Sequence, residues 1–148
     1  ILDKMASGVK VADDTVELYK AMKLRKTNNR YLIMYIDQSD GLIKVEYTKE
    51  RDGSISQEEE FKEFLDRLPS DVGRYCIVDL TIPQKNGALK DIMFLITWCP
   101  SGATTKSHIM YTTSKKALTD KIREGMTDIQ ANDLSDLDYR DLLDRGCK

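Results

Sequence analysis

The sequence predicts an α/β (α+β) domain in which a central mixed sheet of four to five strands has helices on both faces. Two observations lead to this prediction. Segments rich in β-branched and aromatic residues alternate along the chain with segments whose apolar residues recur at helical spacing. Two of the β-rich segments, 75–82 and 92–98, are almost continuously apolar, as is typical of strands that are covered on both faces.

The first expected elements are a helix and a hairpin. Asp14 is expected to cap the helix, with Glu17 three residues later as its reciprocal partner. Two strands follow at 31–36 and 42–47. The dipeptide Asp-Gly at 40–41 is typical of the tight turn that joins antiparallel strands, so these two strands are expected to pair.

The middle of the chain predicts a second helix and the two buried strands. Ser56 and Glu59 have the spacing of a capping box. The apolar residues that follow recur at helical spacing until Pro69, which is expected to end the helix. The strands at 75–82 and 92–98 then form the centre of the sheet.

The last third predicts a long helix, a short edge strand and a final helix. The long helix is expected over 104–124. The run Tyr-Thr-Thr-Ser at 111–114 should bend it, because hydroxyl side chains can hydrogen-bond to the preceding turn. An edge strand is expected at 129–131, and Ser135 with Asp138 is expected to cap the final helix.

Charge and composition exclude several classes of function. The 148 residues include 23 basic and 25 acidic ones, which is unlike the basic excess of a typical nucleic-acid-binding protein. Cys76, Cys99 and Cys147 form no C-x-x-C pair and are expected to be free thiols in a reducing compartment. No apolar run has the length of a membrane span and no secretory signal is visible, so the cytoplasm is expected.

The sequence also lacks the usual groups of a catalytic site. His108 is the only histidine, which excludes a metal site built from several histidines. No glycine-rich phosphate-binding loop is present. The acids at 13–14 and 58–60 stand at expected helix starts, where negative charge stabilises the helix dipole. We therefore expect no enzyme, no cofactor and no metal, and favour a protein that binds another protein.

The first residues are set aside from the fold. Met5, followed by Ala-Ser-Gly, is interpreted as the native start, and 1–4 as a remnant of cloning. Residues 5–148 are expected to form a single domain and a monomer.

Six segments of the sequence resemble the actin-depolymerising factor/cofilin family. They are MASGV at 5–9, FKEFLDRLPSD at 61–71, RYCIVDL at 74–80, FLITWCP at 94–100, KSHIMYTTSKKAL at 106–118 and DIQANDLSDLD at 128–138. The resemblance implies the actin-depolymerising-factor homology fold. It also implies a protein that binds actin monomers and filaments, prefers ADP-actin, severs or depolymerises filaments, and does no covalent chemistry.

The resemblance further implies two binding surfaces. The monomer-binding surface would consist of Ser7, Gly8, Val9, Thr105, Lys106, His108, Ile109, Thr112, Lys115 and Lys116. The filament-binding surface would consist of Lys85, Lys90, Arg140, Arg145 and Lys148. A regulatory kinase would phosphorylate Ser7, and the protein would work on the cytoskeleton in the cytoplasm.

Two departures from the family pattern bear on binding strength. His108 stands where the family commonly has a second cation in the long helix. Ala-Leu-Lys-Asp at 88–91 stands where the family commonly has a basic cluster. In this hairpin and in the final helix, acids are interleaved with the cations and should partly cancel them. We therefore expect filament binding to be weaker than is usual for the family and more sensitive to salt.

Two alternative functions stay open. The first is a module of the same fold that binds the actin branch-nucleating complex, although the Ser-Gly-Val start and Lys106 favour a true cofilin. The second is a membrane-surface protein regulated by phosphoinositides, for which Lys23, Arg25, Lys26 and Arg30 would form the basic patch. The same basic run at 23–26 is interpreted as a solvated turn, so nuclear entry is not supported.

Overall fold

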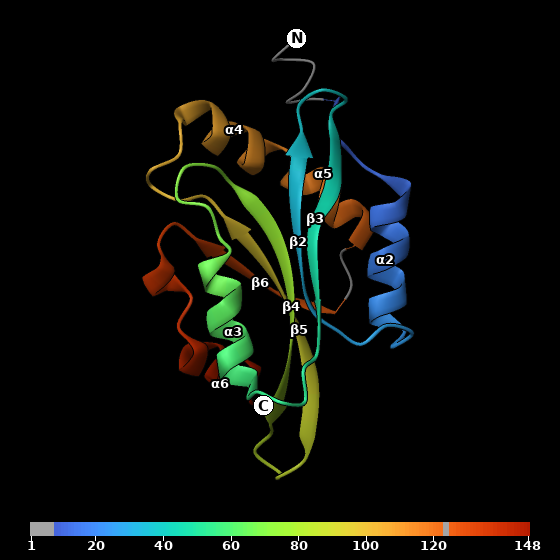
Figure 1. Cartoon of the computed structure of the whole chain (residues 1–148), viewed down its shortest axis with the longest axis vertical. Coiled ribbons are helices and arrows are strands. Elements are labelled where there is room, and N and C mark those ends of the chain that lie inside the picture. The colour runs from blue at the N-terminus through green and yellow to red at the C-terminus, as the bar shows by residue number, and fades with distance from the viewer. Residues whose placement is uncertain (1–7, 123–124) are drawn as a thin grey trace.

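The computed structural model describes residues 8–122 and 125–148. Its elements are β1 (Lys10–Val11), α2 (Asp13–Lys23), β2 (Asn29–Asp37), β3 (Leu42–Glu50), α3 (Gln57–Asp66), β4 (Arg74–Pro83), β5 (Leu89–Trp98), α4 (Thr105–Thr113), α5 (Lys115–Ile122), β6 (Met126–Ala131), the 3-10 helix η1 (Leu134–Asp136) and α6 (Tyr139–Gly146). Helices α2, α4 and α5 pack on one face of the sheet, and α3 and α6 pack on the other (Figure 1). Within the described residues, no helix is both long enough and apolar enough to cross a bilayer.

The sheet is mixed, as expected, but it has six strands in the order β1-β3-β2-β4-β5-β6, so the expected number of four to five is wrong. The four inner strands pair antiparallel, whereas β1 runs parallel to β3 and β6 runs parallel to β5. β1 has only two residues, too few to leave a periodic pattern in the sequence. β6 begins at Met126, three residues before the expected edge strand at 129–131.

The central strands are buried on both faces, as their continuous apolar runs predict. Successive side chains of a strand point to opposite faces. In β4, Tyr75 and Ile77 therefore join the apolar core under α2, α4 and α5. Cys76 and Val78 join the core under α3 and α6. Each helix layer thus has its own core, and the sheet separates the two cores.

Two expected helix caps are wrong. Ala12 precedes α2 and provides no capping side chain, so Asp14 lies in the first turn of the helix instead of capping it. Ser135 does not cap the final helix: Asp133 and Asp136 form a capping box around η1, and α6 starts separately. Short polar residues cluster at both places, so the sequence marks a helix start there without identifying the capping residue.

The start of α3 contains one confirmed cap and one error. The Ser56 side chain accepts a hydrogen bond from the Glu59 amide at 3.1 Å, which is one half of the expected capping box; within the described residues the Glu59 side chain does not return the bond to the Ser56 backbone. Glu60, however, is only 1% exposed and does not act as a solvated helix-end charge. Its carboxylate lies 3.1 Å from Nε of Arg30 and accepts a hydrogen bond from the Asp52 amide at 3.0 Å. A buried ion pair therefore joins α3 to β2.

Candidate functional site

The expected long helix is divided into α4 and α5 at Ser114, within the segment 111–114 where the sequence predicts a bend. The Thr113 hydroxyl donates to the carbonyl oxygen of Ile109 at 2.8 Å, which is the hydrogen bond that bends helices of this kind. The Ala117 amide then bonds to the Ser114 carbonyl at 3.1 Å, in a tighter turn than that of an α-helix. The bend gives α4 a direction different from that of α5.

Buried polar contacts fix the inner face of α4. The Ser107 hydroxyl accepts a hydrogen bond from the Gly73 amide at 3.1 Å. The Tyr111 hydroxyl accepts from the Ile36 amide at 3.0 Å, and the Tyr75 hydroxyl donates to the Tyr111 carbonyl. Gly73 lies so close to Tyr111 that a Cβ at Gly73 would come within 2.6 Å of the ring. The outer face of α4 is therefore held on a rigid support.

The outer face of α4 presents an isoleucine between lysines. Ile109 is 53% exposed, and the Lys116 side chain at the start of α5 is 83% exposed. Lys106 is exposed, and within the described residues it has no ion pair. Thr105 and Thr112, the remaining exposed members of the predicted surface on this face, flank them. We call the surface formed by Thr105, Lys106, Ile109, Thr112 and Lys116 the α4 face.

Three residues of the predicted monomer-binding surface are engaged by the protein itself. Val9 is 6% exposed and belongs to the core. His108 is half-buried and donates from Nε2 to the Pro100 carbonyl at 2.8 Å. Lys115 is half-buried, with its ammonium 2.6 Å from the carboxylate of Asp128. Val9 is therefore not available at the surface, and the half-buried side chains of His108 and Lys115 are each held by a partner from another segment of the chain. Gly8 is exposed, and Ser7 lies outside the described residues.

A second candidate surface lies at the opposite end of the molecule, on the long β4–β5 hairpin (Figure 1). Gln84 links this hairpin to the end of α6: its side-chain amide donates to the Gly146 carbonyl at 2.9 Å, and its oxygen accepts from the Lys148 amide at 2.9 Å. The Lys85 amide donates to the Lys148 carbonyl at 3.1 Å. The structure therefore brings together Lys85 and Lys148, which are far apart in the sequence.

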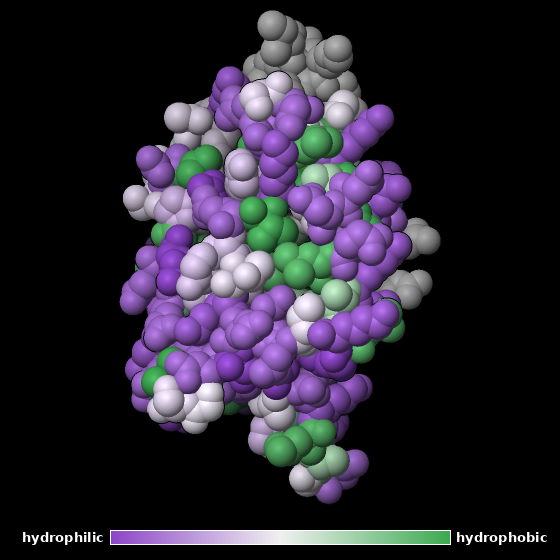
Figure 2. All heavy atoms as spheres, turned by 45° about the vertical axis from the view of Figure 1, so that its right-hand side comes forward, coloured by the Kyte–Doolittle hydropathy of each residue, from purple (hydrophilic) through white to green (hydrophobic). Residues whose placement is uncertain are grey.

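Leu89 is the residue of this second surface that the sequence analysis missed. It is 70% exposed, more than any other large hydrophobic residue described, and lies beside Lys90. Figure 2 shows a small apolar patch on the hairpin at the bottom of the molecule. The sequence contains a signal that could have identified Leu89. It is an apolar residue just after the Asn-Gly turn at 86–87, and neither residue two positions away in the strand, Gly87 or Asp91, has a large apolar side chain. We call Lys85, Leu89, Lys90 and Lys148 the hairpin face.

The expected cancellation of charge on the hairpin does not occur. Asp91 turns away from Lys90: its carboxylate accepts from the Thr81 hydroxyl at 2.6 Å and lies 3.7 Å from Arg51. Burial opposes the charge of Asp91, but the bond from Thr81 and the nearby guanidinium groups outweigh it and lower its pKa. On α6, Arg145 does pair with an acid, Asp141, at 3.4 Å, while Arg140 is exposed. The hairpin face therefore keeps its positive charge.

The basic patch expected to bind phosphoinositides is not assembled. Arg30 is 7% exposed and is paired with Glu60. Arg25 is paired with the buried carboxylate of Asp79 and lies 3.7 Å from Asp91. Two of the guanidinium groups that the patch would require are therefore neutralised within the fold.

The described residues offer no metal-binding cluster, and two of the cysteines are poor nucleophiles. They contain no cluster of three or more histidine, cysteine or acidic residues that could hold a metal. Burial raises the pKa of the Cys76 and Cys99 thiols, so the nucleophilic thiolate is disfavoured at both positions. The α4 face and the hairpin face, both suited to binding a macromolecule, are the candidate functional surfaces.

Comparisons with known proteins point to one family. The model of the cofilin/tropomyosin-type actin-binding proteins matches residues 8–146. Actin-depolymerizing factor 11 of Oryza sativa subsp. japonica is 31% identical over 141 residues, covering 95% of this chain and 92% of its own. Cofilin of Schizosaccharomyces pombe is 33% identical over 139 residues, covering 94% and 95%. The crystal structure of a Streptomyces griseoflavus cofilin superimposes with a TM-score of 0.78 at 26% identity, covering 93% of this chain and 96% of its own.

Proposed function

Because this chain belongs to the family of cofilin/tropomyosin-type actin-binding proteins, we propose that it binds actin monomers through the α4 face and filaments through the hairpin face. The family is not enzymatic, and its activity is binding. The observation that carries the proposal is the α4 face itself: a half-exposed isoleucine between the unpaired Lys106 and the largely exposed Lys116, which pairs only with Asp120 on its own helix, and an inner helix face that is locked to the sheet. A central apolar anchor surrounded by charge is the usual arrangement of an energetically important contact.

The proposed consequence of binding is filament turnover. The protein would bind ADP-actin in preference to other states and promote depolymerisation and severing, because a protein that binds one filament state more tightly shifts the population toward that state. It would act as a monomer in the cytoplasm. Co-sedimentation with filaments, alongside affinity for ADP-bound monomers, tests this directly. Binding to the branch-nucleating complex without binding to actin would favour the alternative module.

The hairpin face gives a prediction for filaments. Replacing Leu89 and Lys90 together with alanine should weaken filament binding about fivefold to tenfold, because a truncated anchor residue usually costs more than ~1 kcal/mol. Affinity for monomers should stay unchanged. Filament co-sedimentation at low and high salt measures the effect. Because Leu89 is apolar, part of the wild-type binding should survive high salt, contrary to the sequence-based expectation.

A matched control for this variant comes from the loop after α2. Leu24 is 64% exposed and lies near the exposed Lys26, so the double alanine variant of these two residues removes the same side chains elsewhere. It should leave co-sedimentation unchanged. If both double variants weaken filament binding equally, the hairpin face is not the filament contact.

Ser7 is proposed as the position of a regulatory phosphate. The proposal rests on the family resemblance of the Ser-Gly-Val segment. A phosphate adds about −1.5 to −2 charges, which would oppose binding to an acidic partner surface. Ser7→Glu should therefore lose monomer binding, and Ser7→Ala should keep it, both with unchanged melting temperature. A stoichiometrically phosphorylated sample with full affinity for monomers would refute the regulatory role.

A further inference from the structure

One edge of the sheet is only partly covered. β1 pairs with β3 at just two positions, Lys10 with Leu42 and Val11 with Ile43. The chain then leaves the sheet at Ala12 and begins α2. Within the described residues, no strand pairs with this side of β3 from Lys44 onward.

The uncovered edge offers a vacant position in the hydrogen-bond ladder at Val45. The carbonyl oxygens of Gly41 and Ile43 accept from the amides of Lys10 and Ala12, so these odd-numbered residues face β1. Backbone groups two residues apart on a strand point in the same direction, so Val45 presents its N–H and C=O to the open side. The pairing of β3 with β2 shifts register immediately afterwards, which leaves Glu46 as a bulge. The vacant edge is therefore short.

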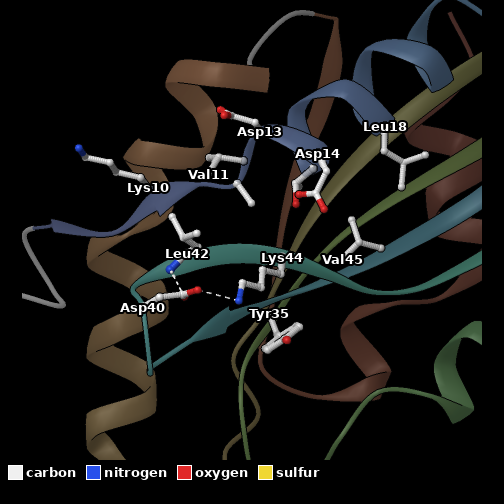
Figure 3. Close-up of a pocket in the computed structure, with 12 residues that line it drawn as sticks. Lys10, Val11, Asp13, Asp14, Leu18, Tyr35, Asp40, Leu42, Lys44 and Val45 are labelled. Carbon is white, nitrogen blue, oxygen red and sulfur yellow. Dashed lines mark hydrogen bonds and ion pairs between the residues drawn. The ribbon is translucent and has the colours of Figure 1, made fainter.

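A groove of about 960 Å³ straddles this edge. Leu18 on α2 faces Val45 on β3 across one side of the groove, whereas Lys44 and Tyr35 lie on the opposite side of β3 (Figure 3). Figure 2, which turns this side of the molecule toward the viewer, shows apolar side chains gathered at the centre of a polar surface. If a strand were added here, its successive side chains would point to opposite faces of the sheet, and the groove has room for them on both faces.

The rim of the groove is acidic. Asp13 and Asp14 are exposed on the first turn of α2, and within the described residues neither has an ion pair. The charge of Lys44 is already neutralised, since its ammonium lies 2.8 Å from Asp37 and 2.7 Å from Asp40. Lys10 points away from the other lining side chains (Figure 3). The groove thus combines apolar walls with unpaired negative charge.

We propose that this groove is a docking site for a short extended segment of a partner protein, in which Lys or Arg alternates with apolar residues. The segment would add to the edge of β3 as a further strand, bonding to the N–H and C=O of Val45. Such strand addition takes its affinity from main-chain hydrogen bonds and its specificity from alternate side chains. A basic side chain fits the groove because its methylene stem can lie on Leu18 and Val45 while its charge reaches Asp14.

A second copy of this chain is a poorer occupant than a basic segment. Two copies joined at this edge would bring the unpaired acids Asp13 and Asp14 of one copy toward those of the other, and like charges repel. The bulge at Glu46 also interrupts the edge that a symmetric pair of β3 strands would need, and bulges are a common protection against such pairing.

The test is binding of a pool of peptides of roughly six residues, a typical strand length, in which Lys or Arg alternates with Val, Ile, Tyr or Phe. Fluorescence anisotropy against the full chain should detect binding. Val45→Pro, which removes the outward N–H, should abolish it. Val45→Ala keeps that N–H and should retain most of the binding. Asp14→Asn should weaken binding about threefold, in line with an exposed ion pair, while Glu58→Gln on α3 should not.

Several outcomes would overturn the proposal. The first is a pool that shows no binding at millimolar peptide concentrations. The second is equal binding by Val45→Pro and Val45→Ala, or by peptides with a central proline. If Val45→Pro fails to fold, the comparison of Asp14→Asn with Glu58→Gln decides, and equal affinity of these two would contradict the docking site. Sedimentation that shows a dimer of the full chain, dissociated by Val45→Pro but not by Val45→Ala, would assign the groove to a second copy instead.

Discussion

Replacing Glu60 with alanine is expected to lower the free energy of unfolding by about 3–5 kcal/mol, the range found when one partner of a buried ion pair is removed. The side chain of Glu60 is 2% exposed and that of Arg30 is 8% exposed. The variant would leave the Arg30 guanidinium buried without its carboxylate. It would also leave the Asp52 amide without its acceptor. Both losses add desolvation costs that no new contact offsets.

Arg30 has further partners that keep it in place in the variant. Its guanidinium donates to the Gln57 side chain at 2.8 Å and to the Asp79 carbonyl at 2.7 Å. The charge therefore stays buried in the variant, while these two acceptors still satisfy part of its hydrogen bonding. Urea unfolding followed by circular dichroism measures the change as a lower midpoint with an unchanged slope.

Glu59→Ala is the matched control, because Glu59 occupies the same turn of α3 and is exposed. Its backbone amide, not its side chain, bonds to Ser56, so the cap survives the substitution. This variant should stay within about 0.5 kcal/mol of the wild type. Similar losses of stability for Glu59→Ala and Glu60→Ala would mean that the Arg30–Glu60 pair contributes nothing particular to the fold.

The contrast between these two glutamates illustrates what the sequence could predict about the fold. Features that depend on near neighbours, such as the Ser56 cap and the bend at 111–114, were predicted in the right places. The burial of Glu60 depends on Arg30, which is 30 positions away and on another element. β1 was missed for a related reason, since a strand of two residues owes its existence to β3 and not to its own pattern.

The same distinction applies to the candidate surfaces. The family resemblance assigned Ile109 and Lys106 to a binding surface, and both are exposed on α4. His108 on α4 and Lys115 at the start of α5 were assigned to the same surface, but the Pro100 carbonyl and the Asp128 carboxylate bind their side chains. Which members of a helix face remain free is decided by the segments that the fold brings beside it, and these are not visible in the helix's own sequence.

The double variant Lys106→Ala with Ile109→Ala is expected to weaken binding to ADP-actin monomers by about thirtyfold or more, which corresponds to the ~2 kcal/mol of a truncated interface anchor. Ile109 would lose the apolar contact at the centre of the α4 face. Lys106, which has no ion pair within the described residues, would lose its attraction to an acidic partner. Neither side chain contributes to the core, so the melting temperature should change little.

The two proposed surfaces serve as controls for each other. The Lys106/Ile109 variant should lose monomer affinity, whereas the Leu89/Lys90 variant should keep it and lose filament co-sedimentation. Figure 1 shows why such a separation is expected: α4 and the β4–β5 hairpin lie at opposite ends of the molecule. Unchanged monomer affinity in the Lys106/Ile109 variant would contradict the proposal that the α4 face binds the monomer. Equal loss of monomer binding in both variants would mean that the rigid sheet between the two ends couples them, so that neither surface acts alone.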